Sequence, residues 1–144
     1  MKELMLKLSQ HLQAMKLCYH NSHHIASRVA FFSDHEAFGS FYGELDGHFD
    51  DVIERSIGLY GSDVANLGII MQGVAAKTAL CPSTKASDNS TLFSYGLQLE
   101  GELVVLVETI CKSPECKEST KQLISEIGNK SEMRQYKIKQ RVKK

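Results

Sequence analysis

The side chains best suited to chemistry in this sequence are histidines and carboxylates between residues 20 and 54, at spacings that suit a metal ion. Imidazole nitrogen and carboxylate oxygen together suit iron, manganese or zinc. Asp50 and Glu54 are four residues apart, so on a helix both point from one face and can share an ion. The alternative is an ordinary solvated helix face. The candidate ligands are His20, His23, His24, His35, Asp50 and Glu54.

Two helices must position these side chains. Apolar residues recur three or four positions apart over residues 3–24, which predicts an amphipathic helix. A second helix is predicted to begin at a capping box, with Ser33 as N-cap and Glu36 reaching back to it. It is predicted to end near Gly61, since a glycine can close a helix.

The predicted second helix holds its own candidate ligands far apart. His35 lies fifteen residues before Asp50, roughly on the same side of the helix but about 22 Å away along its axis. One helix therefore cannot bring both side chains to the same ion. A single site using all of them requires two subunits, and a two-fold antiparallel pairing of this helix gives two equivalent sites per dimer.

The rest of the chain is also predicted to be helical. We expect a short helix within residues 64–79, a third long helix over 91–112, and a fourth from near Pro114 to about residue 138. Strand-type alternation is nearly absent. These elements describe an all-α four-helix bundle over residues 1–138, with a short crossover helix between helices two and three, followed by a basic tail at 139–144.

Charge is unevenly distributed in a chain whose formal net charge is zero. Residues 1–129 hold 10 basic and 16 acidic side chains, whereas residues 130–144 hold 7 basic and 1 acidic. The neutral total argues against a surface that binds polyanions everywhere. It leaves residues 130–144 as the one candidate contact with nucleic acid.

The compartment is predicted from what the sequence lacks. No apolar stretch approaches the length of a membrane span, and the first residues have no signal-peptide core, so we expect a cytoplasmic protein. A reducing compartment implies free thiols. The four cysteines are Cys18, Cys81, Cys111 and Cys116.

One stretch of 33 residues, from His23 to Arg55, carries a family resemblance. It contains Phe31-Phe32, a His-Glu pair beginning twelve residues after His23, and an Asp-Asp-Val-Ile-Glu-Arg run beginning fifteen residues after His35. In residue types and spacing it resembles the Dps (DNA protection during starvation) mini-ferritins. The resemblance extends loosely, through the helical layout, over most of the chain.

The resemblance implies a ferritin-like bundle that assembles as a hollow shell of twelve subunits, built from two-fold dimers. It implies oxidation of Fe(II), typically with hydrogen peroxide, and storage of ferric iron inside. His23 and His35 would come from one subunit, and Asp50 and Glu54 from its partner, as catalytic and metal-binding residues. That division agrees with the spacing along the second helix.

The chain departs from the family pattern in four respects. It has no tryptophan, and Arg28-Val29 stands where the family usually has Gly-Pro. His24 follows His23 directly, which leaves two candidates for the helix-one ligand, and the twelve-residue spacing to His35 favours His23. At positions where the family often has acidic residues lining an iron-entry pore, this chain has Lys117 and Gln122.

Some Dps-like proteins bind DNA through a basic terminal extension. Here that extension would be the C-terminal tail, and twelve copies on a shell would give multivalent, salt-sensitive phosphate contact near the nucleoid. The alternatives are a DNA-compacting scaffold without enzyme activity, a merely solvated tail, or an unrelated bundle without metal. The candidate DNA contacts are Lys137, Lys139, Arg141, Lys143 and Lys144.

Overall fold

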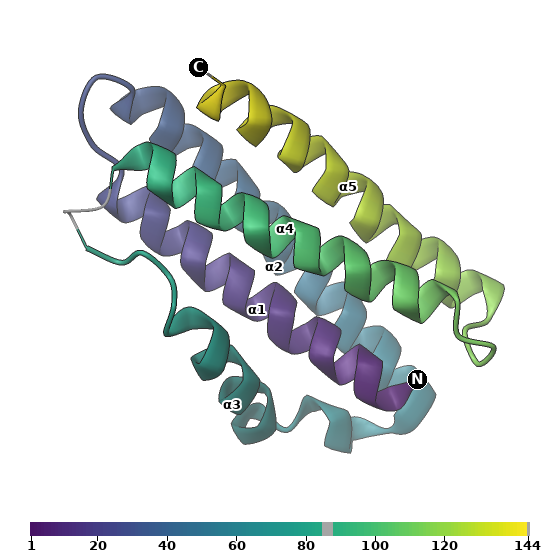
Figure 1. Ribbon diagram of the computed structural model, residues 1–144. Coiled ribbons are helices and arrows are strands. Elements are labelled where there is room, and N and C mark those ends of the chain that lie inside the picture. The colour runs from purple at the N-terminus through teal and green to yellow at the C-terminus, as the bar shows by residue number, and fades with distance from the viewer. Residues whose placement is uncertain (85–87, 144) are drawn as a thin grey trace.

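A computed structural model describes residues 1–84 and 88–143, and within these ranges every regular element is a helix. Four long helices lie side by side, and α3 lies outside them next to α1 (Figure 1). The all-α, ferritin-like bundle is thus confirmed, with a short helix between the second and third long ones. The elements are α1 (Lys2–Ile25), α2 (Phe31–Tyr60), the 3-10 helix η1 (Ser62–Ala65), α3 (Leu67–Thr78), α4 (Asn89–Cys111) and α5 (Glu118–Val142).

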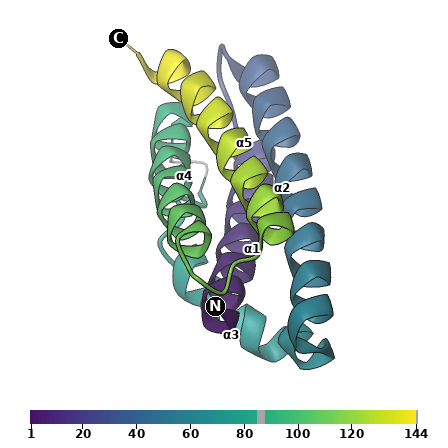
Figure 2. The same ribbon diagram turned by 90° about the vertical axis from the view of Figure 1, so that its right-hand side faces the viewer.

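The core forms where apolar stripes of the long helices meet. On α1, residues such as Leu8, Leu12 and Met15 recur every three or four positions and are fully buried. They pack in one cluster with side chains of α2, α4 and α5, including Phe38 and Leu103. Figure 2 shows the resulting two-layer arrangement, in which α1 and α2 form one antiparallel pair and α4 and α5 the other. Burial of these stripes is the main stabilising contribution to the bundle.

The predicted capping box at the start of α2 is wrong. The helix begins at Phe31, its N-cap is Ala30, and no side chain caps it. The Ser33 hydroxyl instead donates to the Ala30 carbonyl oxygen at 3.1 Å. A tight turn at Arg28, whose φ is +70°, lets the backbone enter the helix earlier, with Phe31 N–H donating to the Arg28 carbonyl. Glu36 is exposed.

The last helix is displaced from its predicted bounds at both ends. It starts at Glu118, because Pro114 lies in a turn closed by the bond from Cys116 N–H to the Ser113 carbonyl at 3.0 Å. It continues to Val142, beyond the predicted end near residue 138. Most of the segment expected to be a tail is therefore helical. It ends beside the α1–α2 connection (Figure 1).

No helix in the described ranges is long and apolar enough to cross a membrane.

Candidate metal site

The structure brings His23 and His35 together where α1 ends and α2 begins. Their rings stack with centroids 3.6 Å apart and planes 21° from parallel. Each ring reaches the other residue's backbone: His23 Nδ1 lies 2.6 Å from the His35 carbonyl oxygen, and His35 Nδ1 lies 2.6 Å from the His23 carbonyl oxygen. Two residues twelve apart in sequence are thus joined by a reciprocal pair of hydrogen bonds.

This reciprocal pairing determines which nitrogen of each ring is free. A carbonyl oxygen can only accept, so the Nδ1 of both His23 and His35 must carry the proton and donate it. In the neutral imidazole the proton on Nδ1 leaves the Nε2 lone pair available. Histidines that bind metals characteristically donate their second ring nitrogen to a carbonyl or carboxylate, which fixes the orientation of the ring. The His23–His35 pair has this arrangement.

Gly39 makes room for the pair. It lies one turn after His35 on α2, and a Cβ at this position would come within 3.1 Å of both Cε1 and Nδ1 of His23. On the other sides, Phe31 stacks on His35 at 4.9 Å between centroids and Tyr42 meets His23 edge-on at 5.4 Å. The histidine pair is therefore enclosed by a glycine and two aromatic rings that restrict its orientation.

The two candidate carboxylates lie elsewhere on α2. Asp50 and Glu54 are both exposed and one turn apart. Since α2 is one continuous helix from Phe31 to Tyr60, the separation of about 22 Å between His35 and Asp50 along the axis holds. Across the described residues, no group of three or more histidine, cysteine or acidic side chains is arranged to hold a metal. One chain does not bring the histidines and the carboxylates together.

His20 and His24 form a second contact on α1, separate from the stacked pair. Their ring centroids are 4.5 Å apart, and His20 also stacks on Tyr42 at 4.2 Å. Burial and the neighbouring histidine charges lower the pKa of His20. His24 is exposed and lies against His20 and His23. The ring that meets His35 is that of His23.

The basic residues near the C-terminus divide into two kinds. Lys137, Lys139 and Lys143 are exposed. Arg141 is paired: its Nε and Nη2 donate to the two oxygens of the buried Asp34 carboxylate at 2.9 and 2.8 Å, and this hydrogen bonding raises the pKa of Arg141. Lys144 lies outside the described residues. The guanidinium of Arg141 thus joins α5 to α2.

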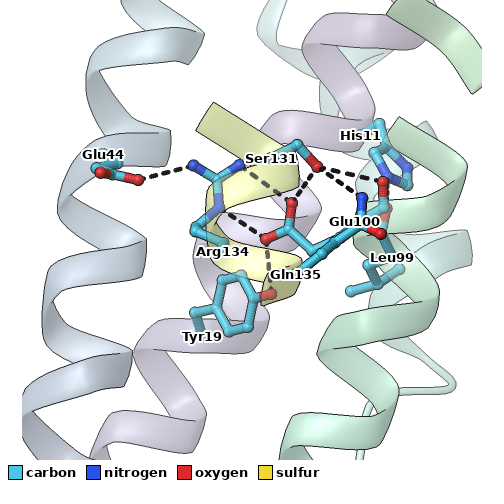
Figure 3. A network of polar contacts seen from close by, with 8 residues as sticks. All are labelled: His11, Tyr19, Glu44, Leu99, Glu100, Ser131, Arg134 and Gln135. Carbon is cyan, nitrogen blue, oxygen red and sulfur yellow. Dashed lines mark hydrogen bonds and ion pairs between the residues drawn. The ribbon is translucent and has the colours of Figure 1, made fainter. Parts of the chain in front are cut away.

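A buried polar network in the middle of the bundle was not predicted from the sequence (Figure 3). The Glu100 side chain is fully buried, and Arg134 is 1% exposed. Arg134 Nε and Nη2 donate to the two Glu100 oxygens at 2.7 and 3.1 Å, and its Nη1 donates to Glu44 at 2.8 Å. Tyr19 and Ser131 donate hydroxyl protons to the same Glu100 carboxylate at 2.8 and 2.6 Å. The network links all four long helices.

The charges in this network stabilise one another. Burial alone would lower the pKa of Arg134, but the charge of Glu100 and its hydrogen bonds raise that pKa above its usual value. Burial, together with the Glu100 charge, raises the pKa of the Tyr19 phenol. Both groups therefore keep their protons, and every oxygen of Glu100 is used as an acceptor.

Helical register was the signal that could have revealed this network. On α5, Ser131 and Arg134 continue the buried stripe formed by Ile127 and Ile138, with steps of three or four residues. On α4, Glu100 stands beside Leu99 in the corresponding stripe. A charged residue on an apolar stripe predicts a buried pair, whereas the charge count over residues 130–144 includes Arg134 without regard to the helix face on which it lies.

The fold defines the class of protein as a ferritin-like helical bundle. A comparison with known proteins gives a relative within that class. Over 86 residues the chain is 33% identical to the DNA protection during starvation protein of Brevibacillus brevis. The similarity spans 60% of this chain and 58% of the length of that curated relative. It supports membership of the Dps family, in agreement with the resemblance found around His23 and Asp50. No family model matches the chain.

Proposed function

We propose that this protein oxidises Fe(II) at sites shared between two subunits and stores the ferric product, as a mini-ferritin of the Dps type. His23 and His35 of one subunit and Asp50 and Glu54 of the other would form each site. The observation that carries this proposal is the reciprocal hydrogen bonding of the two histidines, which leaves both Nε2 atoms free.

The donor set fits iron as a substrate. Two imidazole nitrogens and two carboxylates bind Fe(II), and the carboxylates also stabilise the more highly charged Fe(III). Asp50 and Glu54 are exposed and one turn apart, so both remain available to a partner subunit. With hydrogen peroxide as oxidant, two Fe(II), one peroxide and two protons give two Fe(III) and two water molecules. Pairing the two electrons avoids release of hydroxyl radical.

The direct test is Fe(II) oxidation with hydrogen peroxide by an Asp50→Asn/Glu54→Gln variant. We expect loss of activity with an unchanged fold, since both side chains are exposed. The matched control is Asp51→Asn, an exposed carboxylate next to Asp50 that points about 100° away around the helix. Unchanged oxidation in the double variant would refute the site.

Sharing between subunits has its own test. A His35→Asn variant, which keeps a donor at the Nδ1 position, and the Asp50→Asn/Glu54→Gln variant should each be inactive alone. Coexpressed, they form mixed dimers in which one of the two sites has intact ligands from both subunits. Random pairing then restores about a quarter of wild-type activity. No recovery in verified mixed dimers would contradict a shared site.

The assembly proposed with this activity is a cytoplasmic homo-oligomer of twelve chains. Its mass in solution would be roughly twelve times 16.1 kDa, which light scattering after size-exclusion chromatography measures directly. A monomeric mass would favour the unrelated bundle without metal.

DNA binding through the end of α5 is a second proposal. Its alternative version is a scaffold that binds DNA and has no ferroxidase activity. DNA binding is supported by the exposure of Lys137, Lys139 and Lys143, whereas Arg141 is already paired with Asp34. Replacing the three lysines with glutamine should abolish gel retardation of DNA at low salt and leave Fe(II) oxidation intact. Retardation that survives the substitutions would exclude this surface.

A further inference from the structure

The connection between α1 and α2 has the histidine pair, His23 and His35, on its two sides. His23 lies in the last turn of α1, and His35 follows the first turn of α2. Residues 26–30 join the two helices, and each ring bonds to the backbone of the other helix. The geometry of the histidine pair therefore depends on where this connection holds the two helix ends.

Asn89, at the start of α4, holds this connection through both backbone groups of one residue. Its side-chain oxygen accepts from the Ser27 N–H at 3.0 Å, and its amide nitrogen donates to the Ser27 carbonyl oxygen at 2.9 Å. The same nitrogen donates its second proton to an oxygen of Asp34 at 2.8 Å. Both protons and the oxygen of the amide are thus used, so its orientation is fixed. Asn89 is 7% exposed.

Asp34 extends the network from the connection to α5. Its carboxylate is 2% exposed and accepts from Asn89 as well as from the Nε and Nη2 of Arg141, at 2.9 and 2.8 Å. The Arg141 guanidinium also lies over the Phe93 ring, 5.6 Å from its centroid. A buried carboxylate is costly unless it is paired and hydrogen-bonded, and here both conditions are met. Asp34 is therefore held in one position by α4 and α5.

The position of Asp34 affects His35 because the two residues are adjacent on α2. Neighbouring residues of a helix point about 100° apart, so fixing the direction of Asp34 toward α4 and α5 also fixes the direction of His35. The N-cap residue Ala30 offers no side-chain hydrogen bond to this first turn of α2. The bonds of Asp34 therefore supply an anchor that the cap does not.

We propose that Asn89, Asp34 and Arg141 are positioning residues that hold the histidine pair in its stacked, reciprocally bonded arrangement. Asn89 fixes the backbone four residues after His23, and Asp34 fixes the turn that precedes His35. Arg141 acts at one further step, because it holds the Asp34 carboxylate. The geometry of the two rings is independent of iron, whereas the consequence for Fe(II) oxidation rests on the proposed function.

The packing of each histidine ring can be measured without iron, through exchange of its Cε1 hydrogen for deuterium in the full-length protein. Cε1 of His23 packs against Gly39, so water reaches it slowly while the histidine pair is in place. Tryptic peptides separate the histidines, and fragmentation in the mass spectrometer then assigns each ring. The informative peptides are residues 8–16 with His11, residues 17–28 with His20, His23 and His24, and residues 29–55 with His35 and His48.

The first variant is Asn89→Ala, which removes the amide that holds the connection. We expect exchange in both rings of the histidine pair to become faster by about fivefold or more. Ser90→Ala truncates the exposed next residue and should leave both rates unchanged. The fully buried His11 should also keep its wild-type rate, which separates a local effect from general destabilisation. Unchanged rates in the histidine pair, or an equal acceleration at His11, would overturn the proposal.

The second variant, Arg141→Gln, tests the far end of the network. Exchange at His35 should become faster, and Arg141→Lys should restore part of the wild-type rate because it keeps a cation beside Asp34. The control is Lys130→Gln, which removes the same charge from an exposed side chain of α5. Equal rates in Arg141→Gln and Lys130→Gln would mean that Arg141 has no positioning role.

The consequence for iron is measured separately on Asn89→Ala. We expect the Fe(II) concentration that gives half-maximal oxidation to rise about tenfold, because groups that orient metal ligands affect metal affinity by this order. An unchanged concentration despite faster histidine exchange would overturn the positioning role. A wild-type protein that does not oxidise Fe(II) would instead contradict the proposed function, so the two failures give different results.

Discussion

The two polar clusters of this bundle differ in how completely their hydrogen bonds are satisfied. Around Glu100 and Arg134, both carboxylate oxygens are used and each guanidinium nitrogen has an acidic partner. At His23 and His35, one nitrogen of each ring is bonded and the other is free. The Glu100 oxygens and the Arg134 guanidinium nitrogens all have partners within the described part of one chain, whereas the Nε2 atoms of His23 and His35 do not.

The completeness of the hydrogen bonding distinguishes a cluster that stabilises the fold from one that can bind a ligand more clearly than residue type does. A buried charge that lacks partners is costly, so a complete network holds the helices in one arrangement. A ligand set must instead keep lone pairs available while its orientation is fixed by the remaining bonds. Both clusters contain residues that composition alone would classify together as charged or titratable.

The largest effect that tests this contrast is expected from Arg134→Met, which leaves the fully buried Glu100 without its charged partner. We expect a loss of about 3–5 kcal/mol in the free energy of unfolding, measured by urea denaturation. Adding Glu100→Gln should recover a substantial part, because the amide oxygen still accepts from Tyr19 and Ser131. The control is Lys130→Met, one turn earlier and exposed, which should change stability by less than about 0.5 kcal/mol. A tolerated Arg134→Met would show that the network is not structural.

A smaller effect, on function, is expected from Gly39→Ala. The added Cβ would press on the His23 ring and disturb the reciprocal hydrogen bonds. Because such bonds orient metal ligands, we expect the initial rate of Fe(II) oxidation to fall about tenfold or more. Gly43→Ala is the control, since a Cβ there meets nothing within 4 Å. Equal rates for both variants would mean that the orientation of His23 is unimportant.

Features that belong to one segment of the chain could be predicted from the sequence, whereas features that depend on helix packing could not. Apolar periodicity predicted the long helices, because a stripe facing the core is a property of each segment alone. The helix ends were less accurate: Asp34 and Arg141, 107 residues apart, meet at the start of α2, and no local pattern reports such a pairing. The family resemblance over residues 23–55 implied that His23 and His35 belong together. Gly39 and the Glu100 network depend on how helices pack, which the sequence does not state directly.

The smallest effect is expected on the pH dependence of stability, through the buried His11. His11 is fully buried, its Nε2 bonds to the Leu99 carbonyl at 2.8 Å, and its Nδ1 has no hydrogen-bond partner. Burial lowers the pKa of His11 below its usual 6.5, although Glu102 at 3.8 Å opposes this. In the unfolded chain the His11 imidazole therefore binds a proton near pH 6.5, whereas in the folded chain it stays neutral at that pH. The free energy of unfolding consequently falls as the pH drops below that value.

The pH dependence of urea unfolding between pH 7 and 5 measures this contribution. One extra proton bound by the unfolded chain gives at most about 1.4 kcal/mol per pH unit. His11→Gln, which keeps a donor for Leu99, should reduce that slope relative to the wild-type protein. Identical slopes would mean that His11 is protonated in the folded chain.

The unbroken length of α2 has a consequence for how this sequence can vary. A helix converts residue count into distance and direction, so one residue inserted between His35 and Asp50 shifts the carboxylates by about 1.5 Å and rotates them by about 100°. Neighbouring side chains can compensate for a substitution along this stretch. They cannot compensate for an insertion or deletion, because it moves the carboxylates relative to His35. Homologues that share the four proposed ligands should therefore keep the interval of fifteen residues unchanged, while gaining or losing residues freely in the connections after α2 and α4.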